Sequence, residues 1–436
     1  MTKQALYNVN EEGVVSFAGH NVRDLVEQFG SPLIVILEDE VRERCKLYRG
    51  EMAANYPRTQ VHYAGKAFLT TGFCRLLQDE GMGLDVVSWG ELETAIAAGF
   101  PPSWILMHGN AKTYRDLERA MEVSVGRIVL DNDTDIERLS AVATRMGKTA
   151  KVMIRVAPGV KPNTHEYIAT GQQDTKFGFN LIGGAAERAV QRIVDMPGLE
   201  LVGVHCHIGS QIFEETPYAL AIDAMIEFYA KIQREYGAPV DEFNMGGGLG
   251  VNYDEDTPPP AIAEHIAVSC KAVLDAAKRH DVEPPLLYME PGRSIVARAG
   301  ITVYTVQSVK KIEGVRNYLS VDGGMTDNPR FALYQAKHPV VAVEHMNESA
   351  DWVWSISGRC CESGDMLQRD VNLPDLKADD LVALLYTGAY TYSMASHYNR
   401  VAKPAVVLVR EGQVGLLAER DTTEDLLSLD RIPEWL

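Results

Sequence analysis

The chain has 436 residues, of which 46% are hydrophobic and 23% charged. These are ordinary proportions for a folded globular protein and exclude an intrinsically disordered one. Its 60 acidic and 42 basic residues give a net charge of −18. A surface of that sign repels phosphate backbones and anionic lipid, so we expect neither nucleic acid nor a membrane as a partner.

The cysteines and the first residues favour a cytoplasmic protein. Of the six cysteines only Cys360 and Cys361 are adjacent, and no CxxC pair occurs, as expected for reduced thiols inside a cell. The opening sequence MTKQALYNVNEEG has no apolar core, so we expect no signal peptide. No apolar run approaches the roughly 20 residues that a membrane span requires.

Short apolar runs alternate with amphipathic segments over residues 33–300. The expected strands are bounded by Gly, Pro or polar residues: Leu33–Leu37, Val61–Ala64, Leu84–Val87, Ile105–Met107, Arg127–Leu130, Val152–Val156, Leu201–Cys206, Glu242–Met245 and Leu286–Met289. The expected helices repeat apolar residues at three- and four-residue spacing: Gly90–Ala98, Tyr114–Glu122, Thr134–Met146, Ala185–Asp195, Tyr218–Tyr236 and Ile262–His280. This alternation predicts a parallel sheet with helical crossovers. About eight repeats over roughly 250 residues favour a closed, TIM-like (β/α)8 barrel over residues 33–300.

The pattern changes after Gly300. Only short helical patterns separate the next expected strands: Ile301–Lys310, Tyr318–Val321, Trp352–Ser357, Leu381–Tyr386 and Ala405–Arg410. We predict a mostly antiparallel β domain over 301–436, which makes the fold class α/β. Residues 1–32 fit no barrel repeat, and we expect them to join this second domain.

Polar residues at the ends of barrel strands are the first candidates for a functional site, because loops at the C-terminal face of a barrel build its sites. Lys66 follows the apolar strand Val61–Ala64. A lysine there can hold a carbonyl cofactor as an imine, or it can simply reach solvent at the barrel rim. On this segment alone the rim is favoured.

A second segment contains His205, His207 and Ser210. On a strand the two histidines would point to the same side. They could bind a metal, lie against an aromatic cofactor or be hydrogen-bonded core residues. Because carboxylate or cysteine ligands at suitable spacing are missing nearby, we expect no metal. Ser210 offers a hydroxyl to an anion.

Glycines and charged residues follow two further strands. Gly246, Gly247 and Gly248 allow the backbone to approach a phosphate, but they do not form the GxGxxG dinucleotide pattern. Glu290 and Arg293 follow the strand Leu286–Met289. They could serve two ligand charges of opposite sign or merely pair with each other.

The second domain holds three more candidate segments. Arg330 and Tyr334 follow the sequence Asp322-Gly323-Gly324-Met325, and Tyr390 follows Gly388-Ala389. Cys361 and Glu362 stand in a polar loop bounded by glycines, the setting in which reactive cysteines tend to occur. Adjacent cysteines more often have no role at all.

Taken together, these segments resemble the diaminopimelate decarboxylases, which are alanine-racemase-like, fold-type III pyridoxal-phosphate enzymes. The likeness extends from Phe29 to Arg400, and the order and spacing of the motifs make it specific. Further matching segments are His108–Lys112, Thr170–Gln172, Lys176–Gly178 and Cys361–Asp365.

The resemblance implies a site built around pyridoxal 5′-phosphate. Lys66 would hold the cofactor, His207 would stack on its ring, and Glu290 would face its ring nitrogen. Cys361 matches the proton donor. The implied phosphate-binding residues are Ser210, Gly246, Gly247, Gly248, Gly292, Arg293 and Tyr390. The implied substrate contacts are Arg293, Arg330, Tyr334, Glu362 and Tyr390.

The resemblance also implies a reaction and an assembly. The expected enzyme is a carboxy-lyase that converts meso-2,6-diaminopimelate to L-lysine and CO₂, the last step of lysine biosynthesis. That substrate has a second amino-acid head, which arginines and an acid such as Glu362 are suited to select. In the expected homodimer the β domain of one subunit completes the barrel site of the other.

Other functions stay open. A related decarboxylase of ornithine, lysine or arginine would leave Arg330 without a carboxylate to bind. An amino-acid racemase favours a basic group at the ring nitrogen, and a non-catalytic cofactor carrier would resemble the barrel alone. The chain also departs from many relatives at Phe68, Thr326, Pro329, Phe331 and His397, and none of these departures removes a charged role.

Overall fold

The computed structural model describes residues 6–160, 172, 174–253 and 261–436. It divides into two compact units. The barrel unit comprises Arg42–Asn252 and Thr257–Ile295, and the sheet unit comprises Met1–Val41, Tyr253–Asp256 and Val296–Leu436. The resemblance segment Thr170–Gln172 lies mostly outside the described residues, since only Gln172 is among them.

The barrel unit is a closed ring of eight parallel strands among the described residues. The ring runs β5-β6-β7-β8-β9-β11-β12-β13 and closes by pairing β13 with β5. The (β/α)8 prediction is therefore confirmed. The strands are β5 (Thr59–Ala64), β6 (Gly83–Val86), β7 (Ile105–Met107), β8 (Arg127–Leu130), β9 (Ala150–Ala157), β11 (Leu199–His205), β12 (Glu242–Asn244) and β13 (Leu286–Met289), with β10 (Phe179–Asn180) added beside β9.

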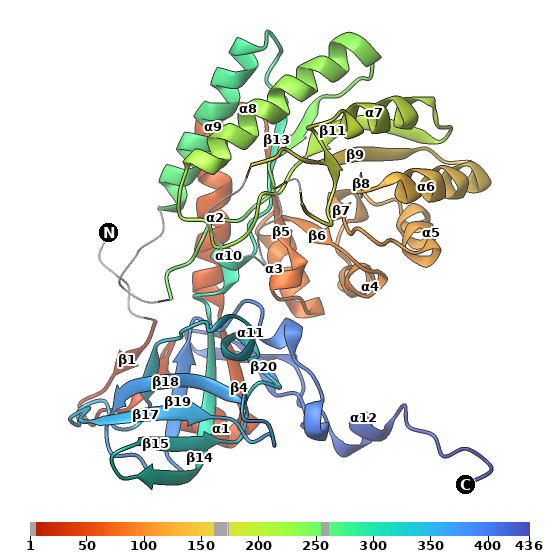
Figure 1. Cartoon of the computed structure of the whole chain (residues 1–436). Helices are drawn as coiled ribbons and strands as arrows, with labels where there is room; N and C mark the ends of the chain where they lie inside the picture. The colour runs from red at the N-terminus through yellow and green to blue at the C-terminus, as the bar shows by residue number, and fades with distance from the viewer. Residues whose placement is uncertain (1–5, 161–171, 173, 254–260) are drawn as a thin grey trace. The chain divides into compact units, whose positions relative to one another are not determined.

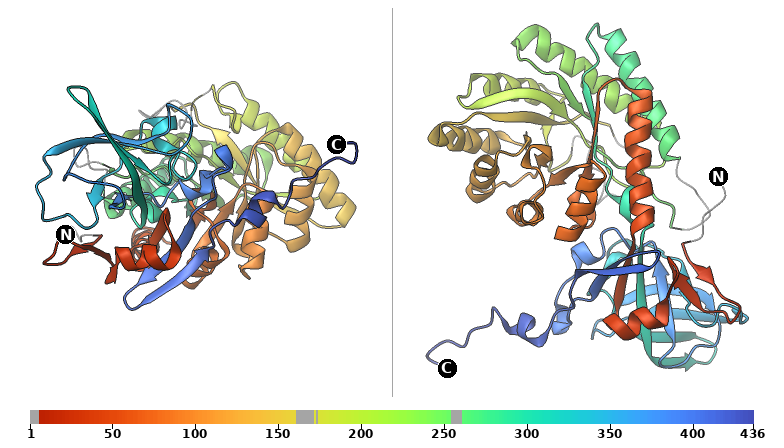
Figure 2. Two further views of the ribbon diagram at one scale, coloured as in Figure 1. Left: turned by 90° about the horizontal axis from the view of Figure 1, so that it is seen from below. Right: turned by 180° about the vertical axis from the view of Figure 1, so that it is seen from behind.

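Helices surround this ring (Figures 1 and 2), and α8 packs beside α9. Their ends follow local rules: Thr113 and Asp116 form a capping box before α5, and Gly147 in the left-handed conformation ends α6, as helix termini favour. The helices are α2 (Glu38–Asn55), α3 (Thr71–Asp79), α4 (Trp89–Ala97), α5 (Tyr114–Val123), α6 (Asp133–Met146), α7 (Ala185–Asp195), α8 (Thr216–Lys231), α9 (Ile262–Arg279) and α10 (Arg293–Val296).

The sheet unit is built on one large mixed sheet. Its main order is β18-β17-β15-β14-β4-β20-β21, with β19 joining β14 to β16. Most pairs are antiparallel, but β15–β17 and β4–β20 are parallel. The elements are β4 (Leu33–Leu37), β14 (Gly300–Ile312), β15 (Arg316–Val321), α11 (Arg330–Tyr334), β16 (Val340–Ala342), β17 (Trp352–Ser357), β18 (Met366–Leu373), β19 (Leu381–Leu385), β20 (Ala405–Arg410), β21 (Gln413–Ala418) and α12 (Thr423–Leu427).

The place of β4 corrects one expectation. We expected Leu33–Leu37 to be the first barrel strand, but it pairs with β14 and β20 in the large sheet. All five residues are buried and apolar. Such a run suits a central strand of either sheet equally, so its composition could not distinguish the two.

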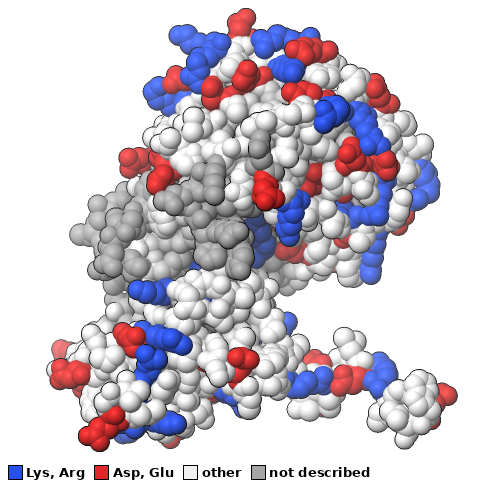
Figure 3. Space-filling view, viewed as in Figure 1, with Lys and Arg blue, Asp and Glu red and all other residues white. Residues whose placement is uncertain are grey.

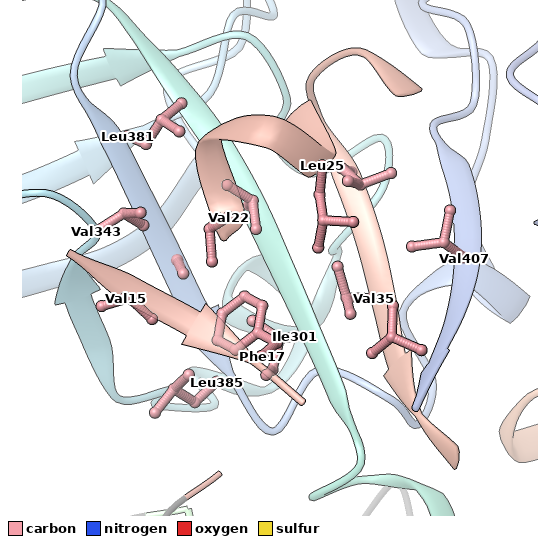
Figure 4. Close-up of a cluster of buried hydrophobic side chains, with 14 of the residues drawn as sticks. Val15, Phe17, Val22, Leu25, Val35, Ile301, Val343, Leu381, Leu385 and Val407 are labelled. Atoms are coloured by element: carbon pink, nitrogen blue, oxygen red, sulfur yellow. The ribbon is translucent and has the colours of Figure 1, made fainter. Parts of the chain in front are cut away.

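N-terminal residues supply part of the core of the sheet unit (Figure 4). Val15 and Phe17 come from β2 (Val15–Phe17), and Val22 and Leu25 come from α1 (Val22–Phe29). They lie in one buried hydrophobic cluster with Ile301 of β14. β1 (Asn8–Val9) and β3 (His20–Asn21) flank β2 in a small antiparallel sheet.

Charged side chains of both signs are interspersed over the visible face of the barrel unit (Figure 3). Several pair across neighbouring helices, as in Arg192 with Asp133 at 2.8 Å. Within the described part of the chain, no helix combines the length and apolar character that crossing a membrane demands.

Candidate active site

The candidate residues of the barrel unit follow four adjacent strands. Lys66 follows β5, His207 and Ser210 follow β11, Gly246 follows β12, and Glu290 follows β13. These strands are neighbours in the order β11-β12-β13-β5. Because parallel strands present their carboxyl ends at one face of a barrel, the structure brings these residues together there.

Lys66 stands on a three-residue 3₁₀ turn, Gly65–Ala67, directly after β5. Its neighbours on the turn are buried, whereas Lys66 itself is exposed. Because the chain turns here, Lys66 lies beyond the end of the apolar strand and is accessible to solvent. The ammonium is close enough to influence the carboxyl of Asp85 and the ring of His207 electrostatically.

His207 is a neutral ring at pH 7. Burial, together with the nearby cations of Lys66 and Arg155, holds its pKa well below the ordinary 6.5. The N–H of Gly247 points at its Nδ1 over 3.3 Å. If Nδ1 accepts that bond, the proton of the neutral ring sits on Nε2.

The glycines after β12 are required by close packing. A side chain at Gly247 would place its Cβ 2.1 Å from the carbonyl oxygen of Glu290. Gly246 has φ +72°, and its N–H donates to Asn244 Oδ1 at 2.9 Å. The N–H groups of Gly246 and Gly247 therefore already have protein acceptors.

Ser210 and Arg293 meet beside these glycines. The guanidinium of Arg293 contacts Ser210 Oγ through Nη2 at 3.1 Å and through Nε at 3.3 Å. Gly292 packs close to strand β5, with an added Cβ only 3.0 Å from that of Ala64. The guanidinium of Arg293, the hydroxyl of Ser210 and the closely packed backbone at Gly292 thus lie together at one end of the barrel. Arg293 contacts Ser210 and does not form an ion pair with Glu290.

Glu290 is the centre of a buried polar network. Its Oε1 lies 2.7 Å from Asn244 Nδ2 and 2.8 Å from His108 Nε2, and its Oε2 lies 3.2 Å from His205 Nε2. Burial raises the pKa of this carboxyl, but His108 and His205 outweigh burial and hold the pKa well below its ordinary value. Glu290 is therefore an anion.

The pKa values of the two histidines in this network are shifted in opposite directions. Burial lowers the pKa of His205 to about 4, so the ring is neutral at pH 7. Burial also lowers the pKa of His108, but the carboxylates of Asp85 and Glu290 outweigh it and raise that pKa. His108 Nε2 lies 3.6 Å from Asp85 Oδ1.

The same three groups have a spacing that could be mistaken for a metal centre. His108, His205 and Glu290 offer ligand atoms within 4.8 Å of one another. However, Oε1 of Glu290 is held at hydrogen-bond distance by Asn244 and His108. An amide N–H donor is not a metal ligand, so we assign the cluster as a proton-bridged network.

Sequence reasoning did not single out Asp85, His108, Asn244 or Arg155. All four are at most 8% exposed, and Arg155 faces Asp131 at 3.5 Å. Asp85, Asn244 and Arg155 are polar residues inside largely apolar barrel strands, and His108 directly follows one. A polar residue at an inward-facing strand position was the signal that could have identified them.

The candidates of the sheet unit lie on three loops that hydrogen bonds join. Arg359 N–H donates to the Gly323 carbonyl at 3.1 Å, and Cys361 N–H donates to Asn399 Oδ1 at 3.2 Å. The Ser396 N–H donates to the Thr326 carbonyl at 2.8 Å. The structure therefore gathers the segments that carry Arg330, Cys361, Glu362 and Tyr390.

Asp365 organises the loop that carries Cys361. Its carboxylate accepts the N–H groups of Met325 at 2.6 Å and Cys360 at 2.7 Å. Burial and Asp365 raise the pKa of the Cys360 thiol to about 11. Cys361, in contrast, is exposed. Of the two adjacent cysteines, Cys361 is therefore the one that presents its thiol to an incoming ligand.

Arg330 is buried at the start of α11, with 4% of its surface exposed. Its Nη1 lies 3.4 Å from the Ala389 carbonyl, next to Tyr390, and its guanidinium lies 4.9 Å from the ring of Tyr253. Tyr390 has φ +59°, an unusual conformation for a tyrosine that turns the chain here. Tyr334, at the end of α11, is half-buried, and Glu362 is exposed.

Two of the residues at which the chain differs from many relatives, Phe68 and His397, contact specific side chains. Phe68 packs edge-on against Phe73 at 5.0 Å, within the apolar core next to Lys66. His397 contacts Asp421 at 2.7 Å on the surface of the sheet unit.

Both parts of the chain match known sequence families. Residues 38–297 match the pyridoxal binding domain of the pyridoxal-dependent decarboxylases, and residues 273–388 match their C-terminal sheet domain. The chain is 44% identical over 421 residues to a diaminopimelate decarboxylase of Bacillus subtilis, covering 97% of this chain and 96% of that protein. It is 43% identical over 431 residues to that of Mycobacterium leprae, covering 97% and 90%.

Solved structures agree with these sequence matches. A diaminopimelate decarboxylase from M. jannaschii in complex with L-lysine has a TM-score of 0.91 and 33% identity, covering 99% of this chain and 98% of that one. One from Helicobacter pylori, also complexed with L-lysine, has a TM-score of 0.84 and 29% identity, covering 94% and 99%.

Proposed function

Because the chain belongs to the family of pyridoxal-dependent decarboxylases, we propose that it is a carboxy-lyase that converts meso-2,6-diaminopimelate to L-lysine and CO₂. This is the last step of lysine biosynthesis. Relatives identical at 40–44% over nearly their full length are named for this activity. One observation of the structure carries the proposal: the buried anion Glu290 lies at the same end of the barrel as the exposed amine of Lys66.

The residues present fit pyridoxal 5′-phosphate. Lys66 has an accessible amine for the aldehyde, and His207 presents a neutral ring. Ser210 and Arg293 supply a hydroxyl and a cation for the phosphate. When bound, the cofactor supplies an electron sink for the charge left on the substrate by the departing CO₂.

In this proposal each residue of the barrel unit has a defined task. Lys66 holds the cofactor, and His207 lies against one face of its ring. Glu290 keeps the ring nitrogen protonated, which a buried anion does by favouring the cationic form of its partner. The phosphate-binding groups are Ser210, Gly246, Gly247, Gly248, Gly292, Arg293 and Tyr390.

The occupied N–H groups of Gly246 and Gly247 refine this assignment. Since both already have protein acceptors, the phosphate would depend more on Gly248, Ser210 and Arg293. Gly246 and Gly247 then act mainly by letting the β12 and β13 loops approach closely.

The residues of the sheet unit would act on the substrate. The exposed Cys361 thiol delivers a proton to the α-carbon after CO₂ has left. Arg330 binds the distal carboxylate and Glu362 the distal ammonium, which a substrate with two amino-acid heads requires. Arg293, Tyr334 and Tyr390 complete the set of substrate contacts.

We further propose that the active sites are composite. In a two-fold homodimer, the sheet unit of one subunit would complete the barrel site of its partner, which yields two equivalent sites. The support is the division of the candidate residues: Lys66 and Glu290 belong to the barrel unit, whereas Cys361, Glu362 and Arg330 belong to the sheet unit.

One assay tests the proposed reaction. The purified protein, loaded with pyridoxal 5′-phosphate, is given meso-diaminopimelate, lysine, ornithine or arginine, and CO₂ release is measured. We expect release from diaminopimelate at a far higher kcat/KM than from the other three. Preference for ornithine, lysine or arginine would assign a related decarboxylase instead. Cofactor binding without CO₂ from any substrate would indicate a carrier.

A further inference from the structure

His108 occupies an unusual position between two buried carboxylates. Its Nε2 lies 2.8 Å from Glu290 Oε1 and 3.6 Å from Asp85 Oδ1. The exposed fractions of the three residues are 4%, 7% and 6% in the order His108, Glu290, Asp85. They come from three different strands: Asp85 lies on β6, His108 follows β7 and Glu290 follows β13.

The ionised Glu290 needs a compensating cation at this depth, because an unpaired buried charge costs several kcal/mol. Burial raises the pKa of Asp85, and the nearby His108, Lys66 and Arg155 oppose that rise. Asn244 is a neutral donor, and His205 is neutral at pH 7. Among the described residues that contact Glu290 directly, His108 is therefore the one whose positively charged form the neighbouring carboxyl groups favour, because they raise its pKa against the effect of burial. Lys66 and Arg155 add to the field from beyond contact distance.

The contacts also orient the carboxylate of Glu290. Oε1 accepts the amide N–H of Asn244 and lies 2.8 Å from His108 Nε2 as an ion-pair contact, whereas Oε2 has the longer 3.2 Å contact to His205. A carboxylate oxygen can accept two hydrogen bonds. The network thus fixes one oxygen firmly and leaves Oε2 the capacity to accept from a further donor.

We propose that His108, held as a cation between Asp85 and Glu290, is a positioning residue that keeps Glu290 ionised and directs Oε2 at an N–H donor of the bound ligand. The inference rests on the proposed function, in which that donor is the ring nitrogen of pyridoxal 5′-phosphate. Removing the charge of His108 then weakens the hold of Glu290 on that proton.

The test removes the positive charge of the side chain and keeps a hydrogen-bond donor. In His108→Gln, the side-chain amide still offers a donor to Glu290 but is neutral. Wild type and variant are loaded with pyridoxal 5′-phosphate labelled with ¹⁵N in the ring, and the ring-nitrogen NMR shift is followed from pH 6 to pH 10. We expect the wild-type nitrogen to stay protonated over a wider range, and the variant to lose the proton at least one pH unit lower.

One pH unit corresponds to about tenfold weaker proton binding. We expect kcat for CO₂ release to fall about tenfold or more, with KM changed less than about twofold. The matched control is His62→Gln. His62 is also a buried barrel histidine, 2% exposed, but its ring contacts Gln60 and not Glu290. This control should titrate like the wild type even if it unfolds at a lower temperature.

A ring-nitrogen titration in His108→Gln identical to that of the wild type would overturn the inference and leave His108 a structural residue. If His108→Gln does not fold, Asp85→Asn provides the second measurement, since it removes the outer carboxylate that favours the cation. Asp85→Asn should shift the ring-nitrogen titration in the same direction by a smaller amount. The absence of any shift in this variant would also overturn the inference. If the wild-type titration changes after dialysis against a chelator, the cluster of His108, His205 and Glu290 is a metal site and the inference is wrong.

These outcomes differ from a failure of the proposed function. If the wild type neither retains the labelled cofactor nor releases CO₂, the function itself is wrong. If the wild type retains the cofactor and releases CO₂, but the variants show no shift of the ring-nitrogen titration, the proposed function is upheld and the proposed role of His108 is wrong.

Discussion

Lys66 illustrates how a single residue combines an apolar setting with chemical reactivity. The strand before it is buried, and the residues on either side of it are buried, yet the lysine is exposed at the end of the turn. A buried ammonium is costly, so the turn stabilises the protein by releasing the charged group while keeping it next to the anionic centre of the barrel.

The first prediction concerns this lysine. Lys66→Ala should abolish the visible absorbance of the bound cofactor and nearly all CO₂ release, because the covalent attachment is lost. Absorbance spectra and turnover measure both effects. Lys151→Ala, which removes an exposed lysine at the start of β9, should change neither. Retention of both properties in Lys66→Ala would contradict the assignment of Lys66.

The second prediction concerns substrate choice. Arg330→Ala should lower kcat/KM for meso-diaminopimelate far more than any residual activity on lysine, which has no distal carboxylate. Loss of a buried charge partner costs about 2–5 kcal/mol, so we expect a decrease of about 30-fold or more for diaminopimelate.

Steady-state kinetics on both substrates decide the matter. Arg369→Ala, at an exposed position on β18, serves as the control and should be neutral. An equal loss on both substrates in Arg330→Ala would make Arg330 a structural residue that braces Tyr253 and Ala389.

At the scale of elements, the loops after β12 and β13 depend on each other. The Gly246 carbonyl accepts the Glu290 N–H at 2.8 Å, and Gly247 approaches the Glu290 carbonyl so closely that no side chain fits. The position of the Glu290 carboxylate is therefore set partly by a glycine on the neighbouring strand. This coupling explains why the site is built from strand ends rather than from long loops.

The third prediction tests that coupling. Gly247→Ala should destabilise the protein by about 1–3 kcal/mol or more, because its Cβ forces the two loops apart, and should weaken cofactor binding. Gly50→Ala is the matched control, since Gly50 lies in α2 with nothing within 4 Å of an added Cβ. It should stabilise the protein by about 0.5–1 kcal/mol. Urea unfolding compares the two, and equal stabilities would refute the packing argument.

At the scale of the whole molecule, the chain divides its candidate residues between two units with separate cores. The barrel unit carries Lys66, His207, Ser210 and Glu290, and the sheet unit carries Arg330, Cys361, Glu362 and Tyr390. Neither unit has the complete set. The composite homodimer proposed above would account for this division, and it can be tested without any structure of the complex.

The fourth prediction is subunit complementation. Lys66→Ala and Cys361→Ala should each be nearly inactive. When the two are mixed and allowed to exchange subunits, one site of each mixed dimer would carry both lesions and the other neither. Random exchange makes about half of the dimers mixed, so activity should return to about a quarter of the wild type. Differently tagged subunits and a pull-down verify the exchange. A mixture that stays inactive although mixed dimers are present would place each site within a single chain.

The sequence by itself determined the fold class and the cofactor of this protein. Periodicity separated helices from strands because side chains repeat every 3.6 residues in one and every two in the other. The alternation of strands and helices then predicted a parallel sheet, and the number of repeats favoured a closed barrel. Lys66, His207, Ser210 and Glu290 could be found because strand ends meet at one face of any such barrel.

Only the tertiary structure decided the rest. Backbone hydrogen bonds between strands are the same for every sequence, so the apolar run Leu33–Leu37 could not reveal which sheet it joins. The network of Asp85, His108 and Glu290 forms only when β6, β7 and β13 close into one ring. The pKa of His108 is raised by the two carboxyl groups that this closure brings to it. The spacing of these residues along the chain does not reveal how close they lie in the folded protein.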